Sequence, residues 1–418
     1  MTPQEIALFA YNLSLVPIIF FSVLFILLSV VNLSLQGKAK AKYKPAKNLP
    51  FVSVQIPTFN DPIAARCVRR CMALDYPRDK YEIIIADDST NRATQELLKE
   101  FANRNSGFIK YLHRANRDNF KAGALNNALN ITKGEIIVIF DSDWMPKRDF
   151  LKRIIRPFSD PKVAIVQSGQ GIYNRNSNLI TRFAAYLMMI YHSIIMPINN
   201  RLNCVFFCGT SGAIRKSAFI RAGGWNLNSI TEDSDLTVNL LLMGYKSVYL
   251  DFETPSEVPD TYEGFLKQQM RWCYGNARAF FDNASGILFK KGLGLRRRMM
   301  ITYVTLGNVI APIIVTMTLF GFAGWFLGEL NLFTIHDFTK FALTFFYTSG
   351  FLFMGIIAMS RKNQLKELHF LLLSALTLGI VLSVANSIAF IRAVANKKLQ
   401  WYCTPKKSNY DLIQNDDS

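Results

Sequence analysis

Two aspartates, Asp141 and Asp143, stand two residues apart directly after the apolar run of residues 135–140. Successive side chains of a strand point to opposite faces, so residues two apart would bring both carboxylates to one place. Mg²⁺ and Mn²⁺ prefer oxygen ligands, and magnesium sites often combine one or two carboxylates with substrate phosphates. The pair therefore suggests a metal–phosphate site. The alternative is a solvated turn after a strand, where aspartate is common.

The region around these aspartates reads as strands alternating with helices. Apolar strands that alternate with helices predict a parallel sheet covered on both faces. Ligands of such sheets bind beyond the carboxyl ends of the strands, where this chain also carries Asn60, Asp87 and Asp88. No glycine-rich phosphate loop follows the first strand, which argues against a P-loop enzyme or a Rossmann dehydrogenase. Strands are expected at residues 51–60, 81–90, 109–114, 135–140 and 163–169, and helices at residues 93–104 and 121–130.

Four apolar stretches are long enough to cross a membrane: residues 8–35, and about 299–327, 341–359 and 370–391. The first lacks the basic start and the cleavage site of a signal peptide, so we expect a retained helix. The net charge of +18 could indicate nucleic acid, but the basic clusters directly flank the apolar stretches. Flanking lysine and arginine mark the cytoplasmic side and attract anionic lipid. We therefore expect no nucleic-acid partner, and an integral protein of the plasma membrane with a cytoplasmic central region.

A later acidic group, Glu232 and Asp233, falls at the start of a predicted helix. One interpretation is structural, because acids suit a helix N-terminus through capping and the macrodipole. The other is that Asp233 acts as a base at the carboxyl ends of the strands. Residues 179–198 are apolar enough to be mistaken for a span. A crossing there would separate Asp141 and Asp143 from Asp233, so this segment is expected to lie in the membrane interface.

Taken together, these motifs resemble the membrane-embedded, processive branch of glycosyltransferase family 2. That branch includes cellulose, hyaluronan, chitin, poly-N-acetylglucosamine and mannan-type synthases. Its signature is an aspartate, a D-x-D, a later aspartate and Q-x-x-R-W. This chain has ADDST at residues 86–90, DSD at 141–143, TED at 231–233 and QQMRW at 268–272. WYCTPKK at residues 401–407 resembles a further loop of the branch, with cysteine in place of valine.

The resemblance implies a GT-A-type α/β glycosyltransferase domain inserted between transmembrane helices, with a role for each matched residue. Asp141 and Asp143 would hold Mg²⁺ or Mn²⁺ on the donor diphosphate, and Asp233 would be the catalytic base. The implied donor contacts are Thr58, Asp87, Asp88, Lys121, Asp141, Gln268, Arg271, Thr404 and Lys406. The implied acceptor contacts are Gly209, Thr210, Glu232 and Trp272.

The implied reaction is inverting, metal-dependent polymerisation of a sugar nucleotide into a β-linked polysaccharide, which the membrane helices would translocate. UDP-glucose, UDP-N-acetylglucosamine and GDP-mannose are all possible donors, and the acceptor is a growing glycan or a lipid. A non-processive transferase that makes a membrane glycolipid is the alternative, and a transporter is a remote one.

The expected organisation has five parts: a transmembrane helix (1–36), the catalytic domain (50–262), interface helices (263–298), a transmembrane bundle (299–394) and a cytoplasmic tail (395–418). Three crossings after the catalytic domain would leave the tail outside, so residues 370–391 are expected to be interfacial or re-entrant.

Overall fold

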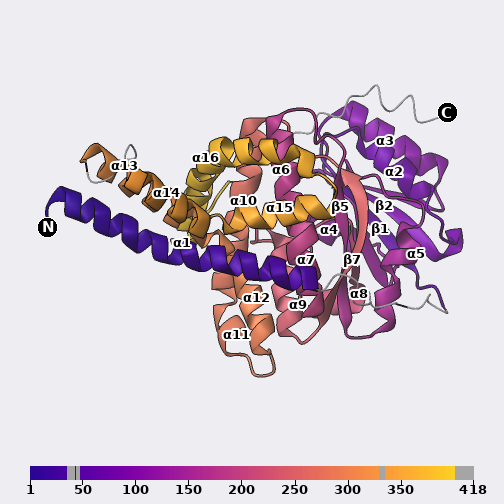
Figure 1. The fold of residues 1–418 in the computed structure, drawn as a ribbon. Coiled ribbons are helices and arrows are strands. Elements are labelled where there is room, and N and C mark those ends of the chain that lie inside the picture. The colour runs from indigo at the N-terminus through magenta and orange to yellow at the C-terminus, as the bar shows by residue number, and fades with distance from the viewer. Residues whose placement is uncertain (35–42, 44–47, 329–334, 401–418) are drawn as a thin grey trace.

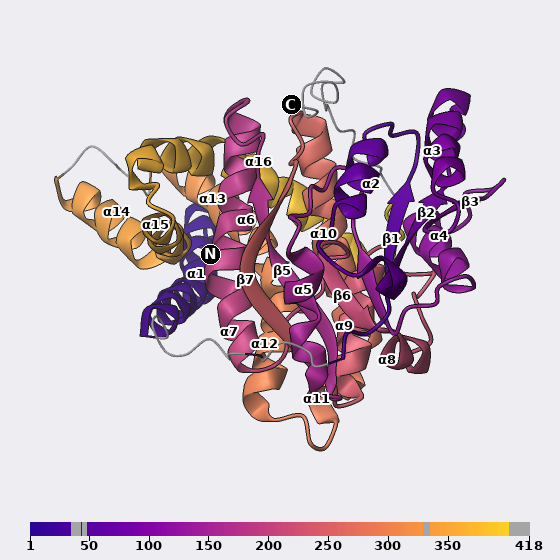
Figure 2. The same cartoon turned by 90° about the vertical axis from the view of Figure 1, so that its right-hand side faces the viewer.

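The computed structural model describes residues 1–34, 43, 48–328 and 335–400. An α/β region forms one end of the molecule, and the apolar helices α1 (Pro3–Ser34), α13 (Ile310–Phe326) and α14 (Ile335–Thr348) extend away from it (Figure 1). Figure 2 shows the strands β1 and β2 on one side of the molecule and these apolar helices on the other.

The α/β region contains a seven-stranded sheet with the strand order β3-β2-β1-β4-β6-β5-β7. The five predicted strands are present, and two more complete the sheet. The strands are β1 (Val52–Thr58), β2 (Tyr81–Asp87), β3 (Ile109–His113), β4 (Ile136–Ile139), β5 (Val163–Ile172), β6 (Gly212–Arg215) and β7 (Lys246–Ser256).

The prediction of a parallel sheet is wrong at one strand. β6 runs antiparallel to both of its neighbours, β4 and β5, whereas the remaining strand pairs are parallel. β6 is only four residues long, so it shows no apolar run from which its presence or direction could be read. The fold is therefore a mixed α/β sheet.

Helices cover both faces of the sheet because successive strand residues alternate between them. Ile83 and Ile85 of β2 pack with α2 (Ala64–Met72), α3 (Arg92–Arg104) and α5 (Phe150–Ile154). Ile84 between them packs with α4 (Phe120–Leu129) on the opposite face. Burying one such isoleucine contributes about 1.5–3 kcal/mol. The remaining helices of this region are α8 (Lys216–Arg221) and α9 (Glu232–Leu242).

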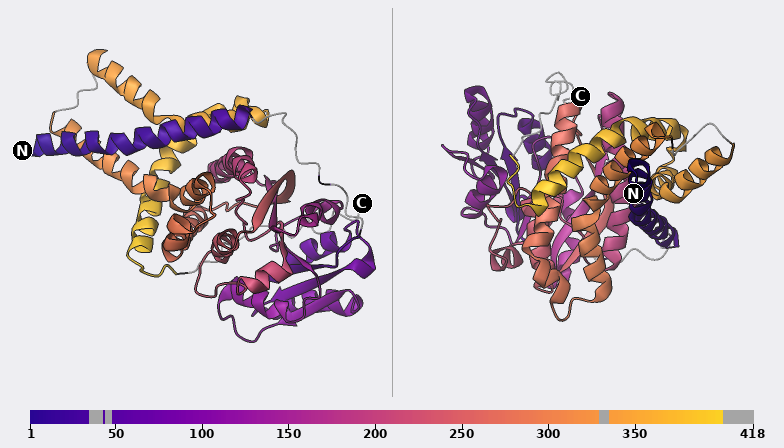
Figure 3. Two further views of the ribbon diagram at one scale, coloured as in Figure 1. Left: turned by 90° about the horizontal axis from the view of Figure 1, so that it is seen from below. Right: turned by 90° about the vertical axis from the view of Figure 1, so that its left-hand side faces the viewer.

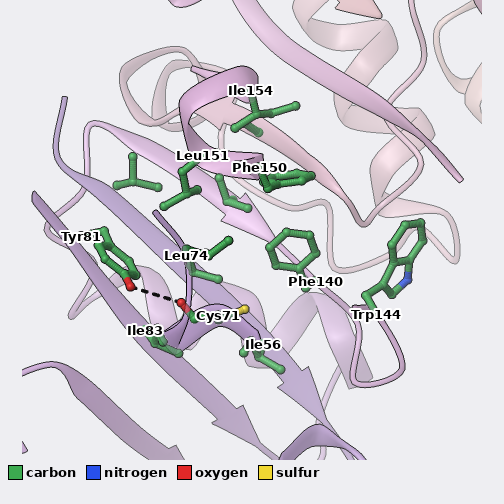
Figure 4. Packing of buried hydrophobic residues seen from close by; sticks show 14 of the residues in the cluster. Ile56, Cys71, Leu74, Tyr81, Ile83, Phe140, Trp144, Phe150, Leu151 and Ile154 are labelled. Carbon is green, nitrogen blue, oxygen red and sulfur yellow. Dashed lines mark hydrogen bonds between the residues drawn. The ribbon is translucent and has the colours of Figure 1, made fainter. Parts of the chain in front are cut away.

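The turn with the two aspartates is anchored by apolar residues on each side of it. Phe140 and Trp144 are both buried in the cluster shown in Figure 4. The Phe140 ring packs edge-on against Phe150 of α5, with ring centroids 4.7 Å apart. This packing fixes the backbone that carries Asp141 and Asp143, so their side chains emerge from a rigid support.

Four helices are long and apolar enough to cross a membrane, or five if a bent pair counts as one span, judged by length and composition of the described residues alone. They are Pro3–Ser34, Leu179–Arg201, Leu295–Phe326 and Leu365–Val394, and the bent pair is Ala342–Thr348 with Gly350–Arg361. Of the residues in each apolar window, 61% are buried for Leu179–Arg201, but at most 33% for the other three. The segment predicted to lie at the interface is thus the one that the protein itself covers most.

The covered segment consists of α6 (Leu179–Ile190), a π-helical turn η3 (Tyr191–Ile195) and α7 (Met196–Arg201). After the sheet come α10 (Tyr262–Asp282), α11 (Ala284–Phe289), α12 (Leu295–Leu306), α15 (Gly350–Arg361) and α16 (Leu368–Val394). Figure 3 shows α1 running along one side of the molecule, next to the apolar helices from the last third of the chain, among them α13 and α15.

α16 packs along α6 and α10, and hydrogen bonds join each of its ends to one of these two helices. Just before its start, Glu367 accepts a hydrogen bond of 2.9 Å from the Tyr186 hydroxyl of α6. At its end, Arg278 of α10 donates a hydrogen bond of 3.1 Å to the carbonyl of Ala393. The expectation that residues 370–391 are interfacial or re-entrant stays a prediction, because Leu365–Val394 is also long and apolar enough to cross a membrane.

Candidate active site

Polar residues gather at the carboxyl ends of β1, β2 and β4, as the strand pattern predicted. Thr58 ends β1, Asp87 ends β2, and Asp141 and Asp143 follow β4. β1 pairs in parallel with both β2 and β4, so these ends lie at one edge of the sheet. This edge is where ligands of α/β domains bind.

Two of the predicted donor contacts already have partners within the protein. Asp87 is fully buried and accepts hydrogen bonds from the Tyr111 hydroxyl at 2.7 Å and the Ser89 amide at 3.0 Å. Asp88 accepts two hydrogen bonds from the Arg114 guanidinium, at 2.6 and 2.7 Å. Asp87 therefore supports the end of β2 from within the protein. Asp88 and Arg114 form a bidentate ion pair at the same edge of the sheet.

The D-x-D turn is held by two hydrogen bonds, one at each aspartate. The backbone N–H of Asp141 donates to the Thr210 hydroxyl at 3.0 Å. The Asp143 side chain, which is only 1% exposed, accepts a hydrogen bond of 3.0 Å from the backbone N–H of Glu257. Thr210, which the resemblance assigned to the acceptor, thus also positions the first aspartate.

A ring of hydrogen bonds supports Asp143. Arg66 of α2 donates to the Asp143 carbonyl at 3.4 Å and to the Tyr173 hydroxyl at 3.0 Å. The Tyr173 hydroxyl in turn donates to the Glu257 carboxylate, and the Glu257 amide closes the ring on Asp143. The sequence analysis missed Arg66, Tyr173 and Glu257. Only Glu257, an acid directly after a strand, carried a recognisable signal.

Lys121 of α4 joins the D-x-D turn to the predicted base. Its Nζ lies 2.6 Å from Asp141 Oδ1 and donates to the Gly209 carbonyl at 2.9 Å. Gly209 has a φ of +74°, and a Cβ on it would lie only 2.9 Å from Asp233 Oδ2 and 3.5 Å from Lys121 Nζ. Glycine is required here because a side chain would displace the carboxylate. The four residues therefore form one connected site.

Asp233 is electrostatically suited to be a general base. Burial and the neighbouring Glu232 carboxylate raise the pKa of Asp233 to about 7, against the opposing charges of Lys121 and Arg271. A general base is most effective when its pKa lies near the working pH. Glu232 is itself buried, so its place next to Asp233 tunes the base. Thr231 precedes the helix without forming a side-chain cap.

Lys121 remains a cation despite its partly enclosed position. Burial alone would lower the pKa of Lys121, but the charges of Asp141 and Glu232 outweigh it, and the pKa is raised. A charged lysine between Asp141 and Asp233 can stabilise negative charge that develops on a substrate.

The Q-x-x-R-W motif lies on α10, and its arginine interacts with the predicted base. Gln268, Arg271 and Trp272 are all half-buried, and the charge of Arg271 acts on Asp233. The buried Nε of Arg271 makes no hydrogen bond within the part of the chain described. A buried guanidinium nitrogen without a partner is costly, so it is available to an anionic ligand.

Tyr191 is a residue of the site that the sequence analysis did not single out. It is half-buried, and its hydroxyl lies within electrostatic reach of Asp233, Cys208 and Tyr303. It comes from the π-helical turn η3 and packs against a cluster that includes residues of α1 and α15. No pattern in the sequence marks a π-helical turn, so this residue was not predictable.

The residues present fit a divalent cation that a substrate helps to hold. Within the described residues, no group of three or more acidic, histidine or cysteine side chains converges as a ready-made metal cage. Asp141 and Asp143 together provide carboxylate oxygens at one turn. Mg²⁺ typically takes one or two carboxylates and completes its shell with phosphates and water. Thr404 and Lys406 lie outside the described residues.

Comparisons with known proteins agree with this geometry. Residues 53–223 match the sequence profile of glycosyl transferase family 2. It is 34% identical over 280 residues to "Probable glucomannan 4-beta-mannosyltransferase 7" from Oryza sativa subsp. japonica, covering 63% of this chain and 47% of that protein. It is 33% identical over 269 residues to "Glucomannan 4-beta-mannosyltransferase 2" from Arabidopsis thaliana, covering 62% and 50%. The chain thus spans about half the length of these curated relatives.

A solved structure shares nearly the whole fold. It is a mannosyltransferase from Pyrobaculum calidifontis in complex with GDP-Man and Mn²⁺, and the superposition has a TM-score of 0.65. The match covers 95% of this chain and 100% of that chain at 19% sequence identity. This likeness establishes a GT-A-like α/β fold together with the arrangement of the accompanying helices.

Proposed function

We propose that this protein is an inverting glycosyltransferase that transfers a sugar from a sugar nucleotide to a hydroxyl group of a glycan, forming a β-linkage. The observation that carries the proposal is the connected site of Asp141, Lys121, Gly209 and Asp233. It places a diphosphate-binding turn and a base with a pKa of about 7 next to each other.

In this mechanism, Asp233 accepts the proton of the acceptor hydroxyl as its oxygen attacks the anomeric carbon. General-base assistance of this kind contributes about 10²–10⁴-fold to the rate. Lys121 and Arg271 stabilise the negative charge that grows on the departing diphosphate. Attack from the face opposite the leaving group inverts the anomeric centre, so an α-linked donor gives a β-glycoside.

The acceptor lies on the side of Asp233 that faces the apolar helices. Trp272 and Tyr191 provide flat aromatic faces there for the C–H groups of a sugar ring. A Mg²⁺ or Mn²⁺ ion would be held by Asp141 and Asp143 and would supply charge neutralisation for the diphosphate.

GDP-mannose is the first candidate donor. The similar plant proteins are named as mannosyltransferases, and the solved structure with the same fold holds GDP-Man with Mn²⁺. A donor panel tests this choice: purified protein is incubated with GDP-mannose, GDP-glucose, UDP-glucose and UDP-N-acetylglucosamine, and nucleotide release is measured with and without Mn²⁺. Release with GDP-mannose and a β-mannoside product support the proposal. No release and no product with any donor would refute it.

Two products fit this chemistry, a polysaccharide and a membrane glycolipid. The Q-x-x-R-W motif favours polymerisation, since it is typical of the processive branch. The apolar helices suit a glycolipid acceptor, because at most a third of the residues in the windows of α1, α12–α13 and α16 are covered by the protein, which leaves most of these surfaces to lipid. A ladder of long products identifies a polymerase, and a single lipid-bound sugar identifies a glycolipid transferase.

The proposed location is a membrane, with the catalytic domain on the cytoplasmic side. The tail motif of residues 401–407 is proposed as a lid, with Thr404 and Lys406 contacting the diphosphate. Closing such a lid would exclude water from the donor and limit its hydrolysis.

A further inference from the structure

Three segments that are far apart in the sequence meet at the π-helical turn η3. Asn32 lies in the last turn of α1, Arg361 is the last residue of α15, and η3 joins α6 to α7. π-Helical turns are rare, and they occur frequently at functional sites. Two of the three elements that meet here, α1 and α15, are apolar helices outside the α/β region (Figure 1).

The side chain of Asn32 is bonded specifically to this turn. Its Nδ2 donates to the carbonyls of Ser193 at 3.0 Å and of Ile194 at 2.9 Å. Asn32 is only 2% exposed, so losing these bonds would leave a buried amide and two buried carbonyls without these partners. A buried polar group without a partner is unfavourable, so these bonds hold the end of α1 to the turn.

Arg361 completes the arrangement. Its Nη1 donates to the Ser193 carbonyl at 2.7 Å and also to the Asn32 side-chain oxygen. Asn32 therefore receives one hydrogen bond and gives two, so its amide orientation is determined. We call Asn32 and Arg361 the clamp.

The opposite side of the turn is anchored to the sheet. The His192 ring is buried and stacks on Tyr249 of β7, with centroids 5.9 Å apart and an interplanar angle of 30°. Neither ring nitrogen of His192 makes a hydrogen bond within the described part of the chain. Packing alone therefore holds this side of the turn, and the directional hydrogen bonds come from the clamp.

Tyr191 begins the turn and, like Cys208, packs against the buried cluster of Met196, Val205 and Tyr249. Cys208 directly precedes Gly209, which lies against the Asp233 carboxylate. We infer that Asn32 and Arg361 are positioning residues, which place Tyr191 next to the base by holding the π-helical turn. The ends of α1 and α15 would thereby set how the acceptor sugar is presented to Asp233. This inference rests on the proposed function, because it assigns Tyr191 to the acceptor side of the same site.

Acceptor binding and donor binding depend on different contacts in this site. The donor-side groups, Asp141 and Lys121, are held by Thr210 and Gly209, and neither contacts the clamp. Loss of the clamp should therefore impair transfer to a sugar acceptor and leave donor binding unchanged. A general loss of folding would instead lower both.

The test uses the full-length protein in detergent micelles, with GDP-mannose as donor and a manno-oligosaccharide of varied concentration as acceptor. Asn32→Ala and Arg361→Ala are expected to raise the acceptor KM about three- to tenfold, as expected for losing an orienting hydrogen bond. The donor Kd, measured by calorimetry, and donor hydrolysis by water should stay at the wild-type level.

Ser29→Ala is the matched control. Ser29 is as buried as Asn32, but its hydroxyl bonds to the Phe25 carbonyl of its own helix, at 2.8 Å. It should behave as wild type. Tyr191→Leu removes the aromatic face while leaving Asn32 and Arg361 in place, so it tests the same acceptor effect should the Asn32 variant fail to fold.

A raised acceptor KM in the clamp and Tyr191 variants with an unchanged donor Kd supports the inference. Wild-type acceptor kinetics in Tyr191→Leu and in the clamp variants, or a parallel loss of donor affinity, would overturn it. If the wild-type protein transfers no sugar from any donor, the proposed function fails first and this inference fails with it.

Discussion

At the scale of single residues, Asp233 stands out because its surroundings oppose its ionisation. Burial and Glu232 raise the pKa of Asp233 to about 7. The positive charge of Lys121 opposes this rise, so part of the carboxyl is ionised at neutral pH. A second buried acid beside Asp233 makes its ionisation less favourable, which an aspartate that only caps a helix does not require. The electrostatics therefore favour the base over the helix cap, the two interpretations that the sequence left open.

We predict that Asp233→Asn lowers the rate of transfer by about 10²–10⁴-fold and leaves donor affinity intact, because the base acts only in the chemical step. Initial rates and donor titrations measure the two effects separately. The exposed Asp149→Asn is the control and should be as active as wild type. A variant at position 233 with near wild-type turnover would show that Asp233 only begins the helix.

The raised pKa predicts how the rate depends on pH. Asp233 must be deprotonated to accept a proton, so kcat/KM should rise as the pH increases through about 7. Glu232→Gln removes the neighbouring charge that raises the pKa, so the rising limb should move to lower pH. A pH–rate profile without a limb near neutrality, identical in both proteins, would contradict the assignment.

The same shift has a consequence for stability. A carboxyl whose folded pKa lies above its unfolded value of about 3.9 destabilises the fold above that pH, fully so once the pH exceeds the folded pKa. Asp233→Asn removes this penalty. Its melting temperature should therefore exceed that of the wild type by more at about pH 8 than at about pH 5. Equal melting temperatures at both pH values would mean that the carboxylate is not destabilised by burial.

Asp143 gives the prediction for the metal. Its carboxylate is buried and held by the Glu257 amide, so it is presented in a fixed place. We predict that Asp143→Ala loses most of the Mn²⁺-dependent affinity for the nucleotide, as measured by calorimetry with and without the metal. The exposed Asp149→Ala should bind as wild type. Unchanged metal-dependent binding at position 143 would refute its role as a ligand.

At the scale of elements, the important relation is between α10 and α16. α10 carries Gln268, Arg271 and Trp272 to the site, and α16 packs along it. α10 also carries charged residues along its length, among them Glu263, Lys267 and Arg278. We therefore predict that α16 stays on the catalytic side together with α10.

This packing predicts the side of the membrane on which the tail lies. Cys403 should react with an impermeant thiol reagent from the same side as the catalytic domain, and bound donor should slow the reaction if the tail closes as a lid. A single cysteine introduced as Leu327→Cys, between α13 and α14, should react from the opposite side. Labelling of both positions from one side would mean that α16 crosses the membrane or α13 does not.

At the scale of the whole molecule, a polar seam joins the apolar helices to the α/β region. Lys362 lies 2.6 Å from Glu253 of β7, and Glu367 pairs with Arg175 and Tyr186. These contacts surround the junction of α15 and α16. The basic stretch of residues 361–366 therefore lies against the catalytic side, as its charge predicted.

The seam predicts a stability effect. Glu367→Ala removes a partly buried acceptor of two hydrogen bonds and should cost about 1.5–3 kcal/mol, the usual value for hydrogen bonds to a charged group. Thermal unfolding in detergent measures it. Glu263→Ala, which breaks an exposed i,i+4 pair with Lys267, should cost less than about 1 kcal/mol. Equal costs would show that the seam is no stronger than a surface ion pair.

The sequence alone determined those features that depend on local pattern. The apolar runs predicted five of the seven strands, because periodicity reports burial directly. The acids at the strand ends predicted the edge at which the site lies, since parallel strands bring their carboxyl ends together. Motif spacing pointed to Asp233 and Arg271, which the structure places within electrostatic reach of each other.

The tertiary structure alone decided the features that depend on contacts across the chain. The direction of β6 follows from its neighbours β4 and β5, and four residues carry no signal of direction. The positions of Gly209 and Tyr191 beside Asp233 depend on a left-handed backbone and on a π-helical turn. Asn32 meets Ser193 across 161 positions of sequence. Propensity and periodicity act over a few residues, whereas such contacts exist only once the whole chain is packed.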